Sequence, residues 1–285
     1  MLDRCHDEEQ GIKTEVFPVL TRTTMTNPYL PPEMLDYIVD LLHDEPETLK
    51  RCCLTSKSWI PRTRKHIFAD MEFYYREDVR SWNETFPDPA NSPACYAKTL
   101  YIGPRVSATD PEVGGWIRGF SRVERLEMHN QGLFIDRSAS FAPLHGFLPS
   151  VKSFRIAFAA LPRPWLFNLI FSFPLIEDLD VTALAEAGNY NGSGGETPIA
   201  TQPSIPPMFT GSLELWMKAG MEPFAGRLLS LPGGIHFRKL TLTWLHDKDL
   251  STTMALVEGC SHTLEFLDIT WGLLGKSIRH LCPHR

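Results

Sequence analysis

A short pattern recurs along most of the chain: an apolar residue, any residue and a second apolar residue, usually after one or two polar or charged residues. Its first apolar positions are Leu100, Leu126, Phe154, Leu179, Leu213, Leu240 and Leu267. Successive copies lie 26, 28, 25, 34, 27 and 27 residues apart. A strand–helix unit of this length cannot bury its own apolar face, but stacked units can. The pattern therefore predicts an α/β fold in which repeated units place their strands side by side in a parallel sheet.

The segments between these strands carry helical features. Residues 251–260 contain a Ser N-cap, three apolar residues and a Gly stop, and residues 166–173 and 222–231 also suggest short helices. The one long interval contains residues 188–207, which are rich in Gly, Ser, Thr and Pro. Such a composition cannot bury enough apolar surface to fix its own conformation, so we expect an inserted flexible loop there. Seven units is a minimum, because counting misses strands that have drifted further from the pattern.

The recurring units resemble leucine-rich repeats, whose period is roughly 20 to 29 residues. The resemblance covers residues 98–285. The family usually has an Asn four residues after the first Leu, and here Asn130 occupies that place, whereas the other units have Pro104, Phe158, Ala183, Met217, Trp244 and Trp271. The resemblance implies an irregular leucine-rich-repeat solenoid with a parallel sheet.

Composition and charge exclude several classes of protein. A net charge of -6 argues against a general nucleic-acid binder, which needs a basic face. Residues 1–10 are polar and acidic and do not look like a signal peptide. The longest apolar stretch, residues 165–176, contains Asn168, Ser172 and Pro174 and is shorter than the roughly 20 residues of a membrane span. The six cysteines have no framework spacing. We therefore expect a reduced, intracellular protein, cytoplasmic or nuclear or both, with no nucleic-acid or membrane partner.

Residues 30–68 have a dense helical pattern. A first helix opens at Leu30-Pro31-Pro32, because proline suits the first helical turn, where its missing N–H would have no partner. Met34, Ile38, Leu41 and Leu42 follow the spacing of an amphipathic face, and Leu35 and Val39 widen that apolar stripe. A second helix restarts at residues 44–46, and a basic stretch ends the segment.

This segment resembles an F-box. The features that carry the resemblance are Leu-Pro-x-Glu from Leu30, an Ile eight residues later, a second helix that opens Pro-Glu-x-Leu, and Lys-x-Trp at Lys57. The turn at residues 43–45 is slightly longer than usual, and Ser56 stands where a Cys is common. The resemblance implies binding to a Skp1-type adaptor and, through it, to a cullin. The contact or core positions carried over are Leu30, Pro31, Ile38, Leu42, Leu49 and Trp59.

The strand pattern also predicts an exposed surface, since neighbouring side chains of a strand face opposite ways. The middle residues form one column: Tyr101, Glu127, Arg155, Asp180, Glu214, Thr241 and Asp268. The next exposed positions form a second: Gly103, His129, Ala157, Thr182, Trp216, Thr243 and Thr270. Four carboxylates against one Arg in the first column suggest a basic or polar target, with Tyr101 and Trp216 as aromatic anchors. The alternative is a solvated face with no partner.

The sequence also bears on catalysis and metal binding. The chain has no Gly-x-Gly-x-x-Gly, Walker-type loop, Gly-x-Ser-x-Gly or His-Glu-x-x-His. The closest metal-like cluster is His280, Cys282 and His284 with Cys260 and His262 upstream, at the end of the chain. We therefore expect no catalytic residue, no metal and no cofactor.

Together these features predict a tail at residues 1–27, an F-box at 28–73, a linker at 74–97 and the repeats at 98–285. The predicted function is the substrate-recognition subunit of an SCF-type (Skp1-cullin-F-box) ubiquitin ligase, which would hold an unknown target on its repeats. One alternative is a non-ligase scaffold whose N-terminal helices only cap the repeats. A second is an enzyme that uses the C-terminal His/Cys cluster.

Overall fold

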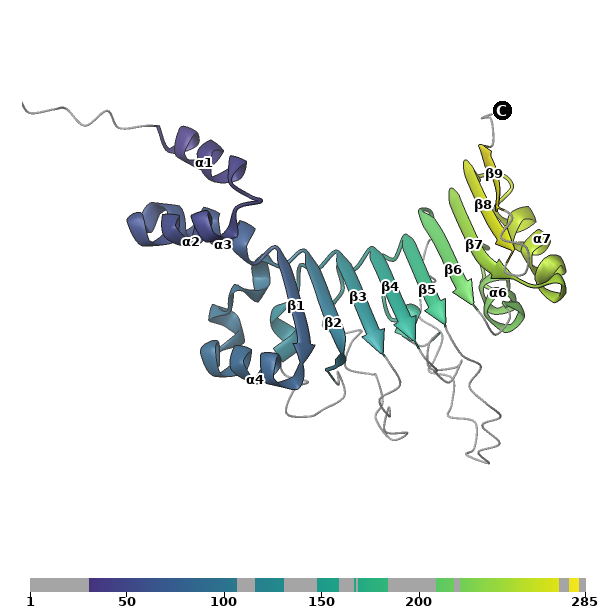
Figure 1. Cartoon of the computed structure of the whole chain (residues 1–285), viewed down its shortest axis with the longest axis horizontal. Helices are drawn as coiled ribbons and strands as arrows, with labels where there is room; N and C mark the ends of the chain where they lie inside the picture. Colours follow the sequence, from purple (N-terminus) through teal and green to yellow (C-terminus); the bar gives the residue numbers. More distant parts are fainter. Residues whose placement is uncertain are drawn as a thin grey trace, which may run out of the picture.

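The computed structural model describes residues 31–106, 116–130, 148–158, 167, 169–183, 209–217, 221–271 and 277–281. The described part is an α/β structure in which a small group of helices precedes a long sheet (Figure 1). The predicted tail at residues 1–27 and the predicted loop at 188–207 lie outside the described residues. No helix within the described ranges is long and apolar enough to cross a membrane.

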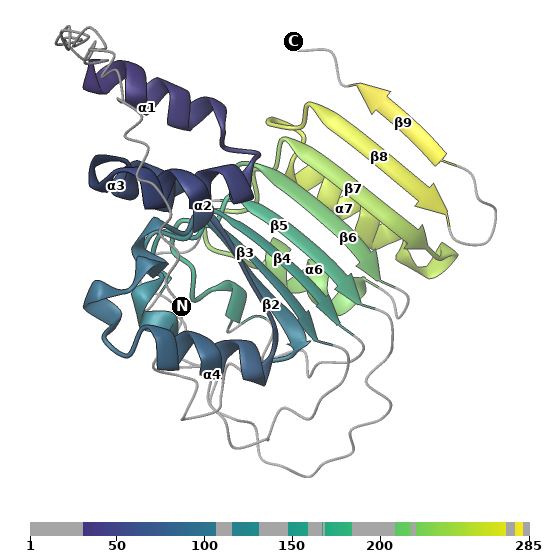
Figure 2. The same ribbon diagram turned by 60° about the vertical axis from the view of Figure 1, so that its left-hand side comes forward.

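The N-terminal helices form a unit that we call the helical module, residues 31–68. It contains α1 (Pro32–Leu41), α2 (Pro46–Thr55), the 3-10 turn η1 (Lys57–Trp59) and α3 (Ile60–Ile67). All three α-helices have a proline in their first two positions, where its missing N–H leaves no hydrogen bond unmade. The module lies beside the β1 end of the sheet, with α1 farthest from the strands (Figure 2).

The sheet has nine strands within the described residues, in the order of the sequence. They are β1 (Asp70–Tyr75), β2 (Thr99–Arg105), β3 (Arg125–Asn130), β4 (Ser153–Phe158), β5 (Asp178–Ala183), β6 (Ser212–Met217), β7 (Lys239–Leu245), β8 (Phe266–Trp271) and β9 (Ser277–Leu281). Strands β1 to β8 are parallel, and β9 pairs with β8 in the antiparallel sense. The predicted parallel sheet is therefore confirmed.

The recurring apolar residues lie in register across the sheet. Leu100 pairs with Leu126, and the ladder continues through Phe154, Leu179, Leu213, Leu240 and Leu267. From Leu100 to Leu240, each of these six side chains is at most 1% exposed. This stacking buries one face of each strand against the next unit, which a single unit could not do by itself.

Strand β1 is an eighth unit that the sequence pattern missed. Its Met71 and Phe73 pair with Leu100 and Ile102 in the same register as the other units. A shared backbone bond confirms the equivalence: the carbonyl of Ala69 accepts the N–H groups of Lys98 (2.7 Å) and Thr99 (3.0 Å). The same paired bond recurs farther along the sheet at the carbonyls of Lys98, Glu124, Lys152, Gly211 and Arg238.

Helices and turns cover one face of the sheet, and the core lies between them. α6 (Glu222–Leu229) and α7 (Leu250–Gly259) lie on the same side of the strands in both views (Figures 1 and 2). Their inward residues include Phe224, Leu228 and Leu256, which are buried with the strand leucines. The predicted helix at residues 222–231 is confirmed, whereas α7 has Asp249 rather than a Ser at its N-cap.

The buried Asp249 has a structural role between units. Its carboxylate accepts the N–H of Met221 (3.0 Å), at the start of the preceding helix, and the N–H of His246 (3.0 Å), in the loop after β7. The short turn η6 (Asp247–Asp249) places it there. These two bonds fix the end of one unit to the helix of the unit before it.

The prediction of a linker at residues 74–97 is wrong. This stretch contains the end of β1, the helix α4 (Arg76–Thr85) and the turns η2 (Pro89–Asn91) and η3 (Pro93–Tyr96). Val79, Ala94 and Ala97 are fully buried in the core, next to η4 (Trp116–Gly119). The polar composition of the segment suggested a linker because only a few apolar residues hold it in the core. The end of the predicted F-box, at residue 73, likewise falls inside a strand of the sheet.

Candidate functional site

Helix α1 has two apolar faces, and one of them is exposed. Met34 (48% exposed), Tyr37 (59%), Ile38 (37%) and Leu41 (63%) follow i, i+3, i+4 and i+7 spacing and form what we call the α1 outer face. On the opposite side Val39 is 1% exposed and faces the interior of the helical module. On α2, Leu54 is also exposed, at 88%. Such a row of large apolar side chains in water is typical of an interaction surface.

The six residues predicted to bind an adaptor do not all lie on this surface. Ile38 belongs to the α1 outer face, and Pro31 is exposed just before the helix. Leu42 and Trp59 are half-buried, and Leu49 is fully buried in the module. Leu30 lies outside the described residues. The structure thus assigns Leu49 to the core and adds Met34, Tyr37, Leu41 and Leu54 to the exposed set.

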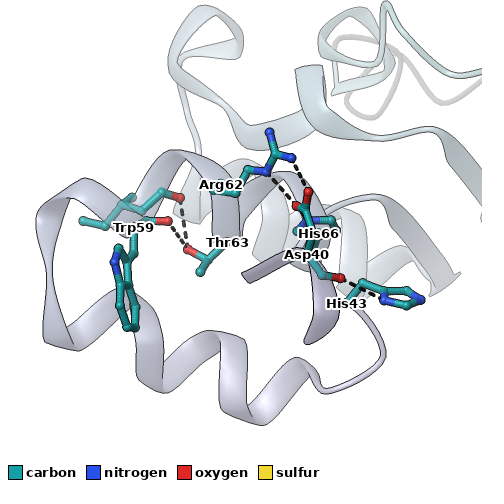
Figure 3. Close-up of polar contacts among 7 residues, drawn as sticks. Asp40, His43, Trp59, Arg62, Thr63 and His66 are labelled. Atoms are coloured by element: carbon teal, nitrogen blue, oxygen red, sulfur yellow. Dashed lines mark hydrogen bonds and ion pairs between the residues drawn. The ribbon is translucent and has the colours of Figure 1, made fainter. Parts of the chain in front are cut away.

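A polar cluster fixes the end of α1 to α3 (Figure 3). Arg62 donates to both carboxylate oxygens of Asp40, one of them at 2.7 Å from Nε, and His66 Nε2 lies 2.7 Å from Asp40 Oδ1. The hydrogen bonds from Arg62 and His66 hold the pKa of Asp40 well below its usual range. A bidentate pair of this kind sets orientation as well as distance. It fastens α1 to α3 in the orientation that turns the α1 outer face outward.

A second contact joins α2 to α3 beneath this cluster. Thr63 is fully buried, and its hydroxyl donates to the carbonyl of Trp59 at 2.8 Å (Figure 3). Cys53 Sγ lies 2.7 Å from the same hydroxyl oxygen. Since the Thr63 proton is used on the carbonyl, the Cys53 thiol is the donor of this second bond. The cysteine is thereby a packing residue of the module.

The second candidate surface is the side of the sheet opposite the core, which we call the open face. The predicted first column lies in register: Tyr101, Glu127, Arg155, Asp180, Glu214, Thr241 and Asp268 are successive partners. β1 adds Glu72 next to Tyr101. From His129 onward the second column is also in register, and it includes Trp216. Every residue predicted for target binding therefore lies on one surface.

Charges on the open face are poorly balanced. Arg155 Nε bonds Asp180 Oδ2 at 2.7 Å, while Asp180 Oδ1 is buried without a hydrogen-bond partner in the described part of the chain. Burial, reinforced by nearby Glu214, raises the pKa of Asp180 to about 6 in spite of Arg155. Glu127 and Glu214 form no ion pair within the described residues. The open face therefore has carboxylates that are available to bind a cationic partner.

Three aromatic rings lie in a row at the β1 end of the open face. The ring centroids of Tyr74 and Tyr101 are 4.9 Å apart, and those of Tyr101 and His129 are 5.0 Å apart. The Tyr74 hydroxyl donates to Glu72 Oε2 at 2.8 Å. Sequence reasoning missed Glu72 and Tyr74, although Met71-Glu72-Phe73 has the same apolar alternation as the other strands.

The C-terminal His/Cys cluster receives no support as a metal site. Cys282 and His284 lie outside the described residues, and no group of three possible ligands occurs within the described ranges. Cys260 is buried in the core, and this burial raises the pKa of its thiol to about 11.

Comparisons with known proteins give no further guide to the family. No family model matches the chain, and no significant match was found among the curated proteins or the solved structures.

Proposed function

We propose that this chain is the substrate-recognition subunit of an SCF-type ubiquitin ligase. In this proposal the α1 outer face and the exposed end of α2 bind a Skp1-type adaptor, which connects the chain to a cullin. The open face of the sheet holds the target protein. We also infer that the strand–helix units are degenerate leucine-rich repeats, on the basis of their period and their shared register.

The observation that carries the proposal is the exposure of the α1 outer face. A module of about 40 residues has too little interior to hide this much apolar surface by itself. α1 lies on the side of the module away from the sheet, so the repeats do not cover it (Figure 2). An amphipathic helix from a partner would bury the row at i, i+3, i+4 and i+7 spacing. The resemblance of residues 30–68 to an F-box supplies the identity of that partner.

The proposed role needs no bond chemistry from the chain itself. A receptor that binds adaptor and target at once raises the local concentration of a target lysine near a charged ubiquitin-conjugating enzyme. The helical module lies at one edge of the sheet, beside β1, while the open face extends along all the following strands (Figure 1). Adaptor and target would therefore bind at separate places on the chain.

A binding measurement with a purified Skp1-type adaptor tests the proposal. The wild-type chain is expected to bind the adaptor, and Ile38→Asp together with Leu41→Asp is expected to weaken binding at least about tenfold, because each places a charge in an apolar contact. Leu250→Asp is the matched control: Leu250 is 50% exposed on α7, away from the module, and its variant should bind like wild type.

Circular dichroism of each variant shows whether the fold is kept. Absence of binding by the wild-type chain would contradict the proposal and favour the alternative in which the helices only cap the repeats. Equal binding by the wild type and the folded Ile38→Asp, Leu41→Asp variant would place the adaptor elsewhere on the chain.

A further inference from the structure

The β1 end of the open face combines aromatic rings and carboxylates in one small area. Glu72, Tyr101 and Glu127 are successive partners across β1, β2 and β3. Tyr101 therefore stands between two carboxylates, and it packs against Tyr74 on one side and His129 on the other. Tyr101 is half-buried, so part of its surface remains accessible above the sheet.

A local irregularity of β1 creates this arrangement. The register between β1 and β2 shifts between Phe73 and Tyr75, which brings Tyr74 over the neighbouring strand. Gly103 permits the close approach: a Cβ at this position would lie 2.8 Å from the Cα of Tyr74. A larger residue here would force the backbone at Tyr74 or Gly103 to shift. The position of the Tyr74 ring therefore depends on the register shift in β1 and on the glycine at position 103.

We propose that these five side chains, Glu72, Tyr74, Tyr101, Glu127 and His129, bind an arginine side chain of the target. This inference rests on the proposed function and adds to it the chemistry of the target segment that the receptor would hold. A guanidinium is planar, so it stacks on an aromatic ring while its N–H groups reach carboxylates at the ring's edges. Neighbouring strands lie about 4.8 Å apart, so the backbone positions of Glu72 on β1 and Glu127 on β3 are roughly 10 Å apart, one on each side of Tyr101.

The charges at the site agree with a cationic occupant. Glu127 has no ion pair or hydrogen bond within the described residues, so its carboxylate is available to a ligand. Glu72 accepts one hydrogen bond from Tyr74 and retains its second oxygen. Burial raises the pKa of Tyr101, and the nearby negative charges of Glu72 and Glu127 add to this rise. A guanidinium would neutralise both carboxylates and keep its contacts with the rings.

Peptide libraries that differ in one central residue test this inference on the full chain. Each library has random neutral positions around a fixed arginine, lysine or citrulline and carries a neutral dye for fluorescence anisotropy. Citrulline has nearly the shape of arginine without its charge. We expect the arginine library to bind at least about tenfold more tightly than the citrulline library and more tightly than the lysine library.

Variants then locate the binding. Glu127→Gln, which keeps the shape of the side chain, and Tyr101→Ala are expected to remove most of the preference for arginine over citrulline. Glu258→Gln is the matched control, since Glu258 is an exposed carboxylate on α7, and it should keep the preference. Equal binding of the arginine and citrulline libraries, or an unchanged preference in folded Glu127→Gln, would overturn the inference. Equal binding of the lysine library would overturn the assignment to arginine.

Adaptor binding measured on the same variants separates this inference from the proposed function. Glu127→Gln and Tyr101→Ala should bind the adaptor like wild type, because they lie on the sheet rather than on α1. Loss of the arginine preference with adaptor binding intact is the expected result. A wild-type chain that prefers arginine but does not bind the adaptor would leave the site standing and contradict the ligase role.

Discussion

Arg155 on β4 bonds Asp180 on β5 across the open face, with 2.7 Å between Nε and Oδ2. The bond satisfies one carboxylate oxygen, while the other is buried without a partner in the described part of the chain, and Glu214 flanks the pair on the next strand. Like charges in directly opposite positions of neighbouring strands destabilise a sheet. Asp180 therefore destabilises the sheet, through its unbonded oxygen and through its position opposite Glu214.

This imbalance predicts a pH dependence. The pKa of Asp180 is raised from 3.8 to about 6, so between these values the folded chain binds more protons at this residue than the unfolded chain. Its contribution to stability consequently falls as the pH rises from about 4 to about 6, and then stays constant. Asp180→Asn should match wild type near pH 4 and be more stable by about 1–3 kcal/mol at pH 7.5. Urea unfolding of both proteins at the two pH values measures this; a difference that is larger at pH 4 would contradict it.

A glycine pair tests the close contact of β1 and β2. Gly103→Ala places a Cβ 2.8 Å from the Cα of Tyr74 and should cost about 1–3 kcal/mol, because backbone must move. The matched substitution Gly226→Ala lies on helix α6, where a Cβ would have nothing within 4 Å, and should stabilise the chain by about 0.5–1 kcal/mol. Thermal unfolding compares the two. Similar effects of both substitutions would show that β1 does not approach β2 as described.

Two leucines of α2 separate core from surface. Leu49 is fully buried, and Leu49→Ala should destabilise the helical module by about 2–4 kcal/mol. Leu54 is 88% exposed, so Leu54→Ala should change stability by less than about 0.5 kcal/mol. Under the proposed function it should instead weaken adaptor binding. Hydrogen exchange of the α2 amides measures the first effect, and a titration with adaptor measures the second. A large stability loss in Leu54→Ala would mean that the side chain is covered.

The cluster at the end of α1 predicts a link between a polar contact and adaptor binding. Asp40→Asn removes the charge that Arg62 and His66 bond, and it should cost about 1 kcal/mol because the pair is partly exposed to solvent. Since the pKa of Asp40 is lowered, this contribution is present above pH 4 and is lost as the pH falls below it. The variant should also bind the adaptor more weakly at neutral pH, because α1 is oriented less firmly.

Asp44→Asn is the control for this substitution. Asp44 is 85% exposed, and its one ion pair within the described residues is with the exposed His43, so its variant should behave like wild type in both assays. Equal adaptor binding by Asp40→Asn and Asp44→Asn would show that the cluster does not position α1.

The strands of the sheet were predictable because their signal is local. An apolar residue at every second position, repeated at nearly constant spacing, marks one buried face, and the strands of the seven predicted units lie in register. β1 was missed because Met71 and Phe73 stand close after the helical module and were assigned to it. Helix α4 was missed because tertiary contacts of a few residues, among them Val79, hold a segment that is polar elsewhere.

The candidate adaptor surface was predictable only in part. Spacing shows that α1 is apolar over a wide arc, but it does not show which of two adjacent positions, Ile38 or Val39, turns inward. In the structure Val39 turns inward, and the bonds from Arg62 and His66 to Asp40, which join residues 22 and 26 positions apart, fasten α1 in that orientation. The aromatic row on the open face depends in the same way on the register shift in β1.

The most direct test of the proposed receptor role is hydrogen–deuterium exchange of the full chain with and without a Skp1-type adaptor. The proposal predicts slower exchange in residues 32–41 and in the second half of α2 when the adaptor is present, with no change in α7, which serves as an internal reference. Unchanged exchange across α1 and α2 at saturating adaptor would contradict it.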